Sequence, residues 1–144
     1  MGSLYKSFFI GVCVVACVVA LCFAETVVFV FDSLPPYEYL ESGTAKGLNV
    51  DIIRSVCKKI GVTPVFREYP WNRAMHRVKN GEADAIFSLY KTKEREEFLL
   101  FPTHPLNDET NVIIVPKESA LRAGSLDDMK KWRVGVVQDY SYGE

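Results

Sequence analysis

Short apolar segments alternate with turn-forming residues along most of the chain, and their pattern predicts a small α/β sheet. Val27–Phe31 is an uninterrupted apolar run, which indicates a strand buried on both faces. Thr63–Tyr69 alternates between apolar and polar positions, and Ala85–Leu89 predicts a third short strand. A helical stretch lies in each interval, so the order is strand, helix, strand, helix, strand. This order is typical of a parallel sheet with right-handed crossovers.

Turn and cap signals set the expected bounds of the first helix. Ser33–Gly47 contains two prolines and two glycines and is expected to form a loop. Asn49 can cap a helix that runs to Ile60, where Gly61 is expected to stop it.

The second helix is expected over Trp71–Asn80, with Pro70 at its first turn and Gly81 at its end. Asp84, close to this turn, is expected to have a structural role at the start of the third strand. The rest of the chain predicts a strand, a short helical turn and a further strand, at Thr110–Val115, Leu126–Lys131 and Arg133–Val137.

The amino-terminal segment has the pattern of a secretory signal peptide. Lys6 precedes the apolar run Phe8–Phe23. Cys22 and Ala24 are small residues at the −3 and −1 positions of a predicted cleavage site after Ala24. We therefore expect an exported, periplasmic protein. Two alternatives are an uncleaved membrane anchor and a lipoprotein that carries its lipid on Cys17.

Composition narrows the class of protein further. The chain has 144 residues, of which 49% are hydrophobic and 24% charged, which is ordinary for a globular protein and excludes a disordered chain or a fibre. The formal net charge is −1, so there is no bulk positive field that could hold nucleic acid.

Cysteine and histidine usage argues against a disulfide framework and a metal site. Beyond residue 24 the chain keeps only Cys57 and cannot form an internal disulfide. Cys57 shares a helical stripe with three apolar residues and is expected to pack in the core with them; they are Val50, Ile53 and Ile60. The two histidines, His76 and His104, are far apart, so no zinc site or other cofactor is expected.

Recognition chemistry is concentrated after the predicted strands. Tyr37 and Tyr39 follow the first strand, Trp71 follows the second, and the segment from Ser88 to Arg95 follows the third. Ligands of such sheets bind at the carboxyl ends of the strands. Aromatic rings provide flat apolar walls, and an arginine beside a helix start can hold an anion. The positions predict a pocket for a small anionic or zwitterionic molecule.

Four segments in this order resemble the bacterial extracellular solute-binding proteins of family 3, the periplasmic receptors of amino-acid ABC transporters. The segments are Pro35–Tyr39, Gly47–Gly61, Trp71–Ile86 and Thr92–Phe101. The resemblance implies the two-lobed periplasmic-binding-protein type II fold. After a signal peptide at 1–24, residues 25–108 would form lobe 1 and residues 109–144 the start of lobe 2.

The resemblance also implies which residues bind the ligand. Arg95 matches the arginine that holds the α-carboxylate of the ligand with its planar guanidinium. Ser88, Tyr90 and Thr92 belong to the loop that supplies further hydrogen bonds to the carboxylate and the amine. Ser141 lies in the turn of the second lobe that offers backbone N–H groups.

Two aromatic residues complete the implied site. Trp71 falls where an apolar side chain supports the body of the ligand, and Tyr37 lies in a loop that closes over it. Structural interpretations of these residues stay open: Trp71 as packing at a helix start, Tyr37 as a loop cover, and Arg95 as an exposed residue paired with a neighbouring glutamate. Thr92 is expected to cap a short helix in the charged run 91–97.

The leading hypothesis is a substrate-binding protein of an ABC uptake system for amino acids or similar small polar or anionic solutes. It would bind the solute carboxylate without chemistry and deliver the solute to a permease in the inner membrane. Alternatives are a sensory input domain and a dehydratase or transglycosylase-associated enzyme, for which Glu38 and Glu68 are candidate carboxylates. Family members continue for roughly another hundred residues, so we expect a truncated receptor that binds its solute weakly or not at all.

Overall fold

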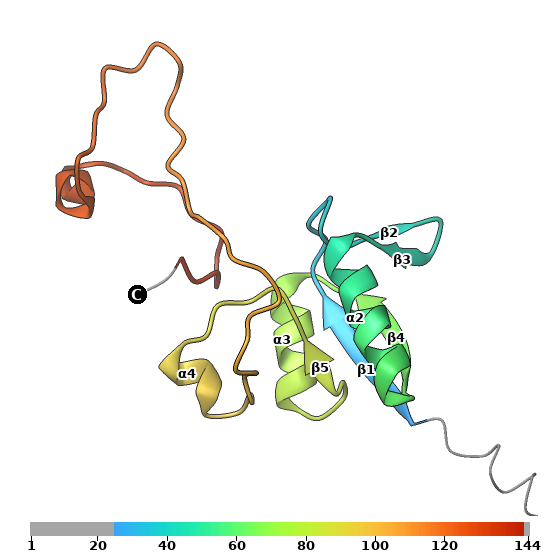
Figure 1. The fold of residues 1–144 in the computed structure, drawn as a ribbon. Coiled ribbons are helices and arrows are strands. Elements are labelled where there is room, and N and C mark those ends of the chain that lie inside the picture. The colour runs from blue at the N-terminus through green and yellow to red at the C-terminus, as the bar shows by residue number, and fades with distance from the viewer. Residues whose placement is uncertain (1–24, 143–144) are drawn as a thin grey trace, which may run out of the picture. The chain divides into compact units, whose positions relative to one another are not determined.

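The computed structural model describes residues 25–142, which form two compact units. The first unit ends at Phe87 and the second begins at Ser88 (Figure 1). The predicted signal peptide and the lipidation of Cys17 lie outside the described residues. No helix between residues 25 and 142 is long and apolar enough to cross a membrane.

A three-stranded parallel sheet forms the centre of the first unit, with the strand order β4-β1-β5. β1 (Thr26–Phe31) is the middle strand, flanked by β4 (Thr63–Glu68) and β5 (Ala85–Ile86). The predicted α/β class and the parallel order are therefore confirmed. β5 is shorter than the predicted Ala85–Leu89, because it pairs with β1 at only two positions. Asp84 has the expected structural role: its carboxylate accepts a hydrogen bond from the backbone N–H of Val28 at 2.8 Å.

The side chains of β1 alternate between two apolar layers. Phe29 and Phe31 point to one face, where their rings lie 5.5 Å from those of Phe66 and Phe87, respectively. On the other face, Val30 is fully buried in a cluster with Ala74, which belongs to the second of the two helices, and Ala83, which follows that helix. A strand covered on both faces needs the uninterrupted apolar sequence that β1 has.

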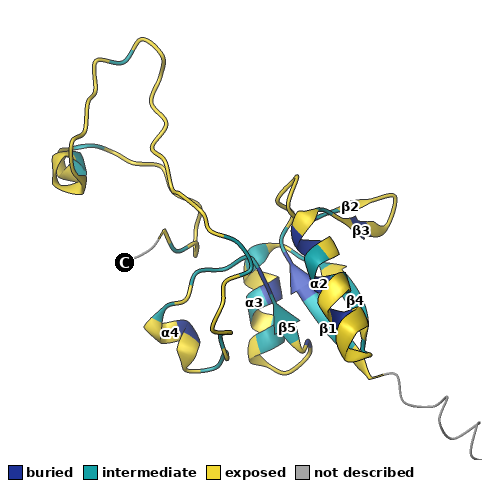
Figure 2. Ribbon diagram, in the orientation of Figure 1, coloured by how far each residue is buried: buried dark blue, intermediate teal, exposed yellow. Residues whose placement is uncertain are grey.

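Two helices return the chain between the strands, as predicted. α2 (Leu48–Ile60) ends at Gly61, whose φ of 76° is the left-handed cap conformation. α3 (Trp71–Lys79) follows Pro70. Figure 2 shows that α2 buries one side and exposes the other. The predicted stripe of α2 is buried at Val50, Ile53 and Cys57, but the prediction for Ile60 is wrong, since this residue of the last turn is 66% exposed.

The predicted loop at Ser33–Gly47 is wrong in part, because it contains an antiparallel hairpin of β2 (Tyr39–Glu41) and β3 (Thr44–Lys46). Ser42 and Gly43 form its two-residue turn, with φ values of 50° and 78°. Positive φ at both central positions is the turn geometry that matches the twist of a hairpin. The two strands have only three residues each. Such short strands show little alternation of apolar and polar residues, so the sequence pattern did not indicate them.

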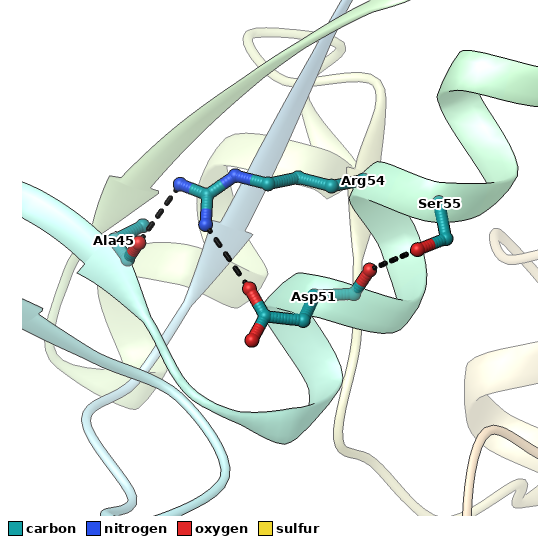
Figure 3. Close-up of polar contacts among 4 residues, drawn as sticks. All are labelled: Ala45, Asp51, Arg54 and Ser55. Atoms are coloured by element: carbon teal, nitrogen blue, oxygen red, sulfur yellow. Dashed lines mark hydrogen bonds and ion pairs between the residues drawn. The ribbon is translucent and has the colours of Figure 1, made fainter.

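Arg54 holds this hairpin against α2 within the first unit (Figure 3). Its guanidinium donates a hydrogen bond to the carbonyl of Ala45 at 2.8 Å and lies 3.3 Å from the carboxylate of Asp51. The same guanidinium lies over the ring of Phe66, 5.3 Å from its centroid. Glu68 adds a second tie, since its carboxylate accepts from the backbone N–H of Leu40 at 3.1 Å.

The helix cap predicted at Asn49 is wrong. α2 begins at Leu48, its cap residue is Gly47, and no side chain caps it. The backbone N–H groups of Leu48 and Asn49 instead donate to the carbonyls of Pro36 and Tyr37, at 3.3 and 3.0 Å. Carbonyl groups of the preceding loop thus replace the side-chain oxygen that a capping residue usually provides.

The second unit contains α4 (Lys93–Glu96) and the 3-10 helix η1 (Leu126–Lys131). η1 confirms the predicted helical turn, and hydrogen bonds from the backbone of Gly124 and Ser125 lower the pKa of Asp128 at its start. The strands predicted at Thr110–Val115 and Arg133–Val137 are wrong: both segments are irregular and exposed. A strand requires a partner for its backbone groups, and in the described part of the chain neither segment has one.

The close approach at Gly47 leads to a stability prediction. Gly47 has φ 116° and ψ 166°, and a Cβ there would collide with the carbonyl oxygen of Tyr37. We expect Gly47→Ala to lower the free energy of unfolding by about 3 kcal/mol or more, as strain and a backbone clash add together. Gly43→Ala is the matched control, because its φ is also positive but the space is open; it should cost about 1 kcal/mol. Equal losses in urea unfolding would contradict the prediction.

Candidate functional site

The carboxyl edge of the sheet in the first unit carries a closed loop after β1. Leu34 and Glu38 pair through their backbones: the N–H of Leu34 donates to the carbonyl of Glu38 at 2.7 Å, and the reverse bond is 3.1 Å. The next strand is held to β1 at the same edge, where the N–H of Tyr69 donates to the carbonyl of Phe31 at 2.9 Å. Both chain segments that leave this edge are therefore fixed close to the sheet.

Two of the predicted ligand-binding residues belong to these segments. Tyr37 lies in the closed loop after β1 and is 36% exposed. Trp71 is the first residue of α3 and is half-buried, which is compatible with both packing and a ligand-binding role. Each presents an aromatic ring at the edge where ligands of parallel sheets bind.

A buried pair that the sequence analysis missed lies next to Tyr37 in the chain. Glu38 and Asn49 are 1% and 0% exposed, and the side-chain amide of Asn49 donates to the carboxylate of Glu38 at 2.8 Å. One signal in the sequence could have indicated it, namely an acidic residue and an amide that flank two glycine-containing turns. Because Glu38 is buried against Asn49 and Glu68 binds the backbone of Leu40, the two carboxylates considered for catalysis are engaged in structural contacts.

The second unit brings together several of the other predicted residues around Arg95. The guanidinium donates through Nη1 to the carbonyl of Tyr90 at 2.8 Å and through Nη2 to the carbonyl of Asp139 at 3.4 Å. The backbone N–H of Arg95 donates to Oγ1 of Thr92 at 3.3 Å, which confirms Thr92 as the cap of α4. Arg95 is 8% exposed, so its interpretation as an exposed surface residue is wrong.

Burial defines the electrostatics of Arg95. Loss of solvent lowers the pKa of its guanidinium, and the negative charge of Glu94 opposes this effect only in part. Lys91 and Glu96 form an ion pair of 2.8 Å at the surface of the same segment, where both side chains are exposed. The charged run 91–97 is thus a solvated face apart from one buried cation.

Polar contacts also hold other predicted residues of the second unit. The phenol oxygen of Tyr90 accepts from the side-chain amide of Asn111 at 3.2 Å, and the same amide donates to the carbonyl of Tyr142 at 2.9 Å. Ser88 and Asp139 both have positive φ, 60° and 62°. Ser141 is half-buried two residues after the second of these bends.

The predicted site residues thus fall into two groups, one in each unit. Arg95, Tyr90 and Thr92 are in direct contact within the second unit, together with Asp139. The binding roles of all seven predicted residues remain a prediction; they are Tyr37, Trp71, Ser88, Tyr90, Thr92, Arg95 and Ser141. Between residues 25 and 142 no three His, Cys, Asp or Glu side chains gather in a way that could hold a metal ion.

Comparison with known sequences identifies one family of proteins. The pattern of the bacterial extracellular solute-binding proteins, family 3, matches residues 27–140. A probable histidine-binding protein of Neisseria gonorrhoeae is 32% identical over 109 residues, which are 74% of this chain and 40% of that protein. A putative ABC transporter arginine-binding protein 2 of Escherichia coli K12 is 28% identical over 116 residues, 78% of this chain and 46% of that protein. The chain thus spans less than half the length of these curated relatives.

Solved structures with similar folds include a histidine kinase sensor domain with similarity to periplasmic binding proteins and the L-cystine solute receptor of Neisseria gonorrhoeae in its unliganded open conformation. Both are 27% identical, with TM-scores of 0.48 and 0.46. Each alignment covers 51% of this chain, and it covers 34% of the sensor domain and 33% of the cystine receptor.

The cap at Thr92 leads to a test of how Arg95 is held. Thr92→Ala removes the acceptor for the backbone N–H of Arg95, and a lost cap costs about 1 kcal/mol. We expect this amide to exchange with solvent about fivefold faster, whereas Thr92→Ser keeps the hydroxyl and should stay near the wild-type rate. Hydrogen exchange followed by NMR measures both variants, and an unchanged rate in Thr92→Ala would show that the cap does not hold α4.

Proposed function

Because the chain belongs to the bacterial extracellular solute-binding proteins of family 3, we propose that it serves an ABC uptake system by binding amino acids or similar small polar solutes. In this role the carboxylate of the solute pairs with the guanidinium of Arg95, and no bond is made or broken. On the family resemblance alone, we also propose Tyr37 and Trp71 of the first unit as ligand-binding aromatic residues.

The observation that carries this proposal is the buried position of Arg95. A guanidinium removed from water loses hydration energy, and here that loss outweighs the attraction of Glu94, since the pKa is lowered. An incoming carboxylate would compensate the buried charge through charge-assisted hydrogen bonds, which are stronger than those to neutral carbonyls. The planar fork of arginine suits such an anion, whereas the ammonium of lysine acts as a point charge.

The substrate class follows from what the curated relatives are named for. One is named as a probable histidine-binding protein and another as a putative arginine-binding protein. These two solutes differ in their side chains and share an α-carboxylate and an α-amine. We infer that Arg95 and the hydroxyl and carbonyl groups of Thr92 and Tyr90 serve the shared part of the solute.

The engaged state of the candidate carboxylates supports binding without catalysis. A general acid or base has to reach the reacting atoms, but Glu38 is buried against Asn49 and Glu68 accepts from the backbone of Leu40.

The partners that go with the proposed uptake role are the solute and a permease in the inner membrane. The location would be the periplasm, reached by means of the segment 1–24.

The carboxylate role of Arg95 can be tested by NMR titration of the purified chain with L-histidine, L-arginine and succinate. We expect shifts of the Arg95 and Thr92 amides with at least one of these solutes. Arg95→Ala should weaken binding about tenfold or more, because a charged hydrogen-bond partner is lost, and Arg95→Lys should lie between the two.

Lys93→Ala is the matched control for the loss of one positive charge, since Lys93 is an exposed residue of the same helix. It should bind like wild type. Equal binding by Arg95→Ala and wild type would contradict the proposed role.

Export can be tested separately by expression in a Gram-negative host. We expect the protein in the periplasmic fraction with Glu25 as its first residue, because the apolar segment ends in small residues before Glu25. Ala24→Arg should block cleavage and leave the longer form in the membrane fraction. Mass spectrometry measures the amino terminus, and a lipid-modified product that begins at Cys17 would support the alternative.

A further inference from the structure

The loop that carries Tyr37 is attached to α2 by its backbone. The N–H groups of Leu48 and Asn49 donate to the carbonyls of Pro36 and Tyr37. The close approach depends on Gly47, where any Cβ would collide with the carbonyl of Tyr37. These contacts leave Tyr37 little freedom relative to the helix.

A buried side-chain contact joins the same two segments a second time. Asn49 lies in the first turn of α2, Glu38 is the last residue of the closed loop, and both side chains are almost completely buried. The 2.8 Å bond from amide to carboxylate therefore joins the end of the loop to the helix in a place from which water is excluded. Removing one partner of a bond in such a place is costly, because the other partner is a buried polar group.

We propose that Glu38 and Asn49 are a positioning pair that holds the loop Leu34–Glu38, and with it the ring of Tyr37, ready for the solute. The proposal rests on the proposed function. Glu38 is bound within the fold, so it acts through Tyr37 and does not contact the solute. A loop ordered before binding loses less conformational freedom when the solute arrives, and affinity increases accordingly.

The nature of the pair predicts which substitutions matter. Asn49→Asp replaces the donor with a second carboxylate at a position whose side chain lies 2.8 Å from the first, and like charges at this distance repel each other. Glu38→Ala removes the acceptor from a buried amide. Glu38→Gln keeps a carbonyl oxygen that can accept from Asn49, so it is the conservative variant that should rescue the contact.

Hydrogen exchange tests the attachment of the loop without any ligand. Asn49→Asp and Glu38→Ala should raise the exchange of the backbone amides at positions 48 and 49 about tenfold relative to the amide of Val30 in the core, and Glu38→Gln by less than about threefold. Arg54→Ala is the control, because it destabilises α2 and the hairpin without touching the loop. If Arg54→Ala releases the two amides equally, the pair has no specific positioning role and the proposal fails.

Titration with L-histidine and L-arginine tests the consequence for binding. Asn49→Asp and Glu38→Ala should bind about tenfold more weakly than wild type, while Glu38→Gln and Arg54→Ala stay within about threefold. Wild-type affinity in Asn49→Asp, with the loop amides released, overturns this proposal alone. The titrations are carried to millimolar concentrations so that weak binding is also detected. If wild type shows no binding to either amino acid in this range although its loop amides are protected, the proposed function has failed, and the proposal falls with it.

Discussion

The burial of β1 on both faces is the constraint on which the first unit depends. Phe31 on one face and Val30 on the other are fully buried, so packed side chains have to cover both faces of the strand. The parallel pairing with β4 and β5 then places all three strand ends at one edge. Within the first unit, the segments that leave this edge carry Tyr37 and Trp71, so the position of these two predicted residues follows from the packing of one strand.

Much of this arrangement could be predicted because it depends on local pattern. The apolar run at Val27–Phe31, the helical stripe of α2 and the stop at Gly61 each have a strong local cause. The cap at Asn49 was predicted wrongly, because the acceptors come from loop carbonyls that no sequence pattern reveals. The strand predicted at Thr110–Val115 is absent for another reason. Its apolar pattern is that of a strand, but a strand forms only when a partner pairs with its backbone groups.

The candidate site shows the same division between local and distant causes. Thr92 could be identified as the cap of α4 from its neighbours, and the structure bears this out. The contact of Arg95 with the carbonyl of Asp139 joins positions that are 44 residues apart, so no local pattern around Arg95 could indicate it. The pair of Glu38 and Asn49 was missed for a related reason. Each residue is common in loops and caps, and only the folded chain shows that they are buried together.

The buried thiol of Cys57 has a consequence for the chemistry of the chain in any oxidising compartment. It is the free cysteine of the described residues and lies 2% exposed on the sheet-facing side of α2. An oxidising compartment converts accessible lone thiols into cross-links between molecules. Because α2 has to leave the sheet before this sulfur can react, the packing of one helix also protects the chain against covalent dimerisation through Cys57.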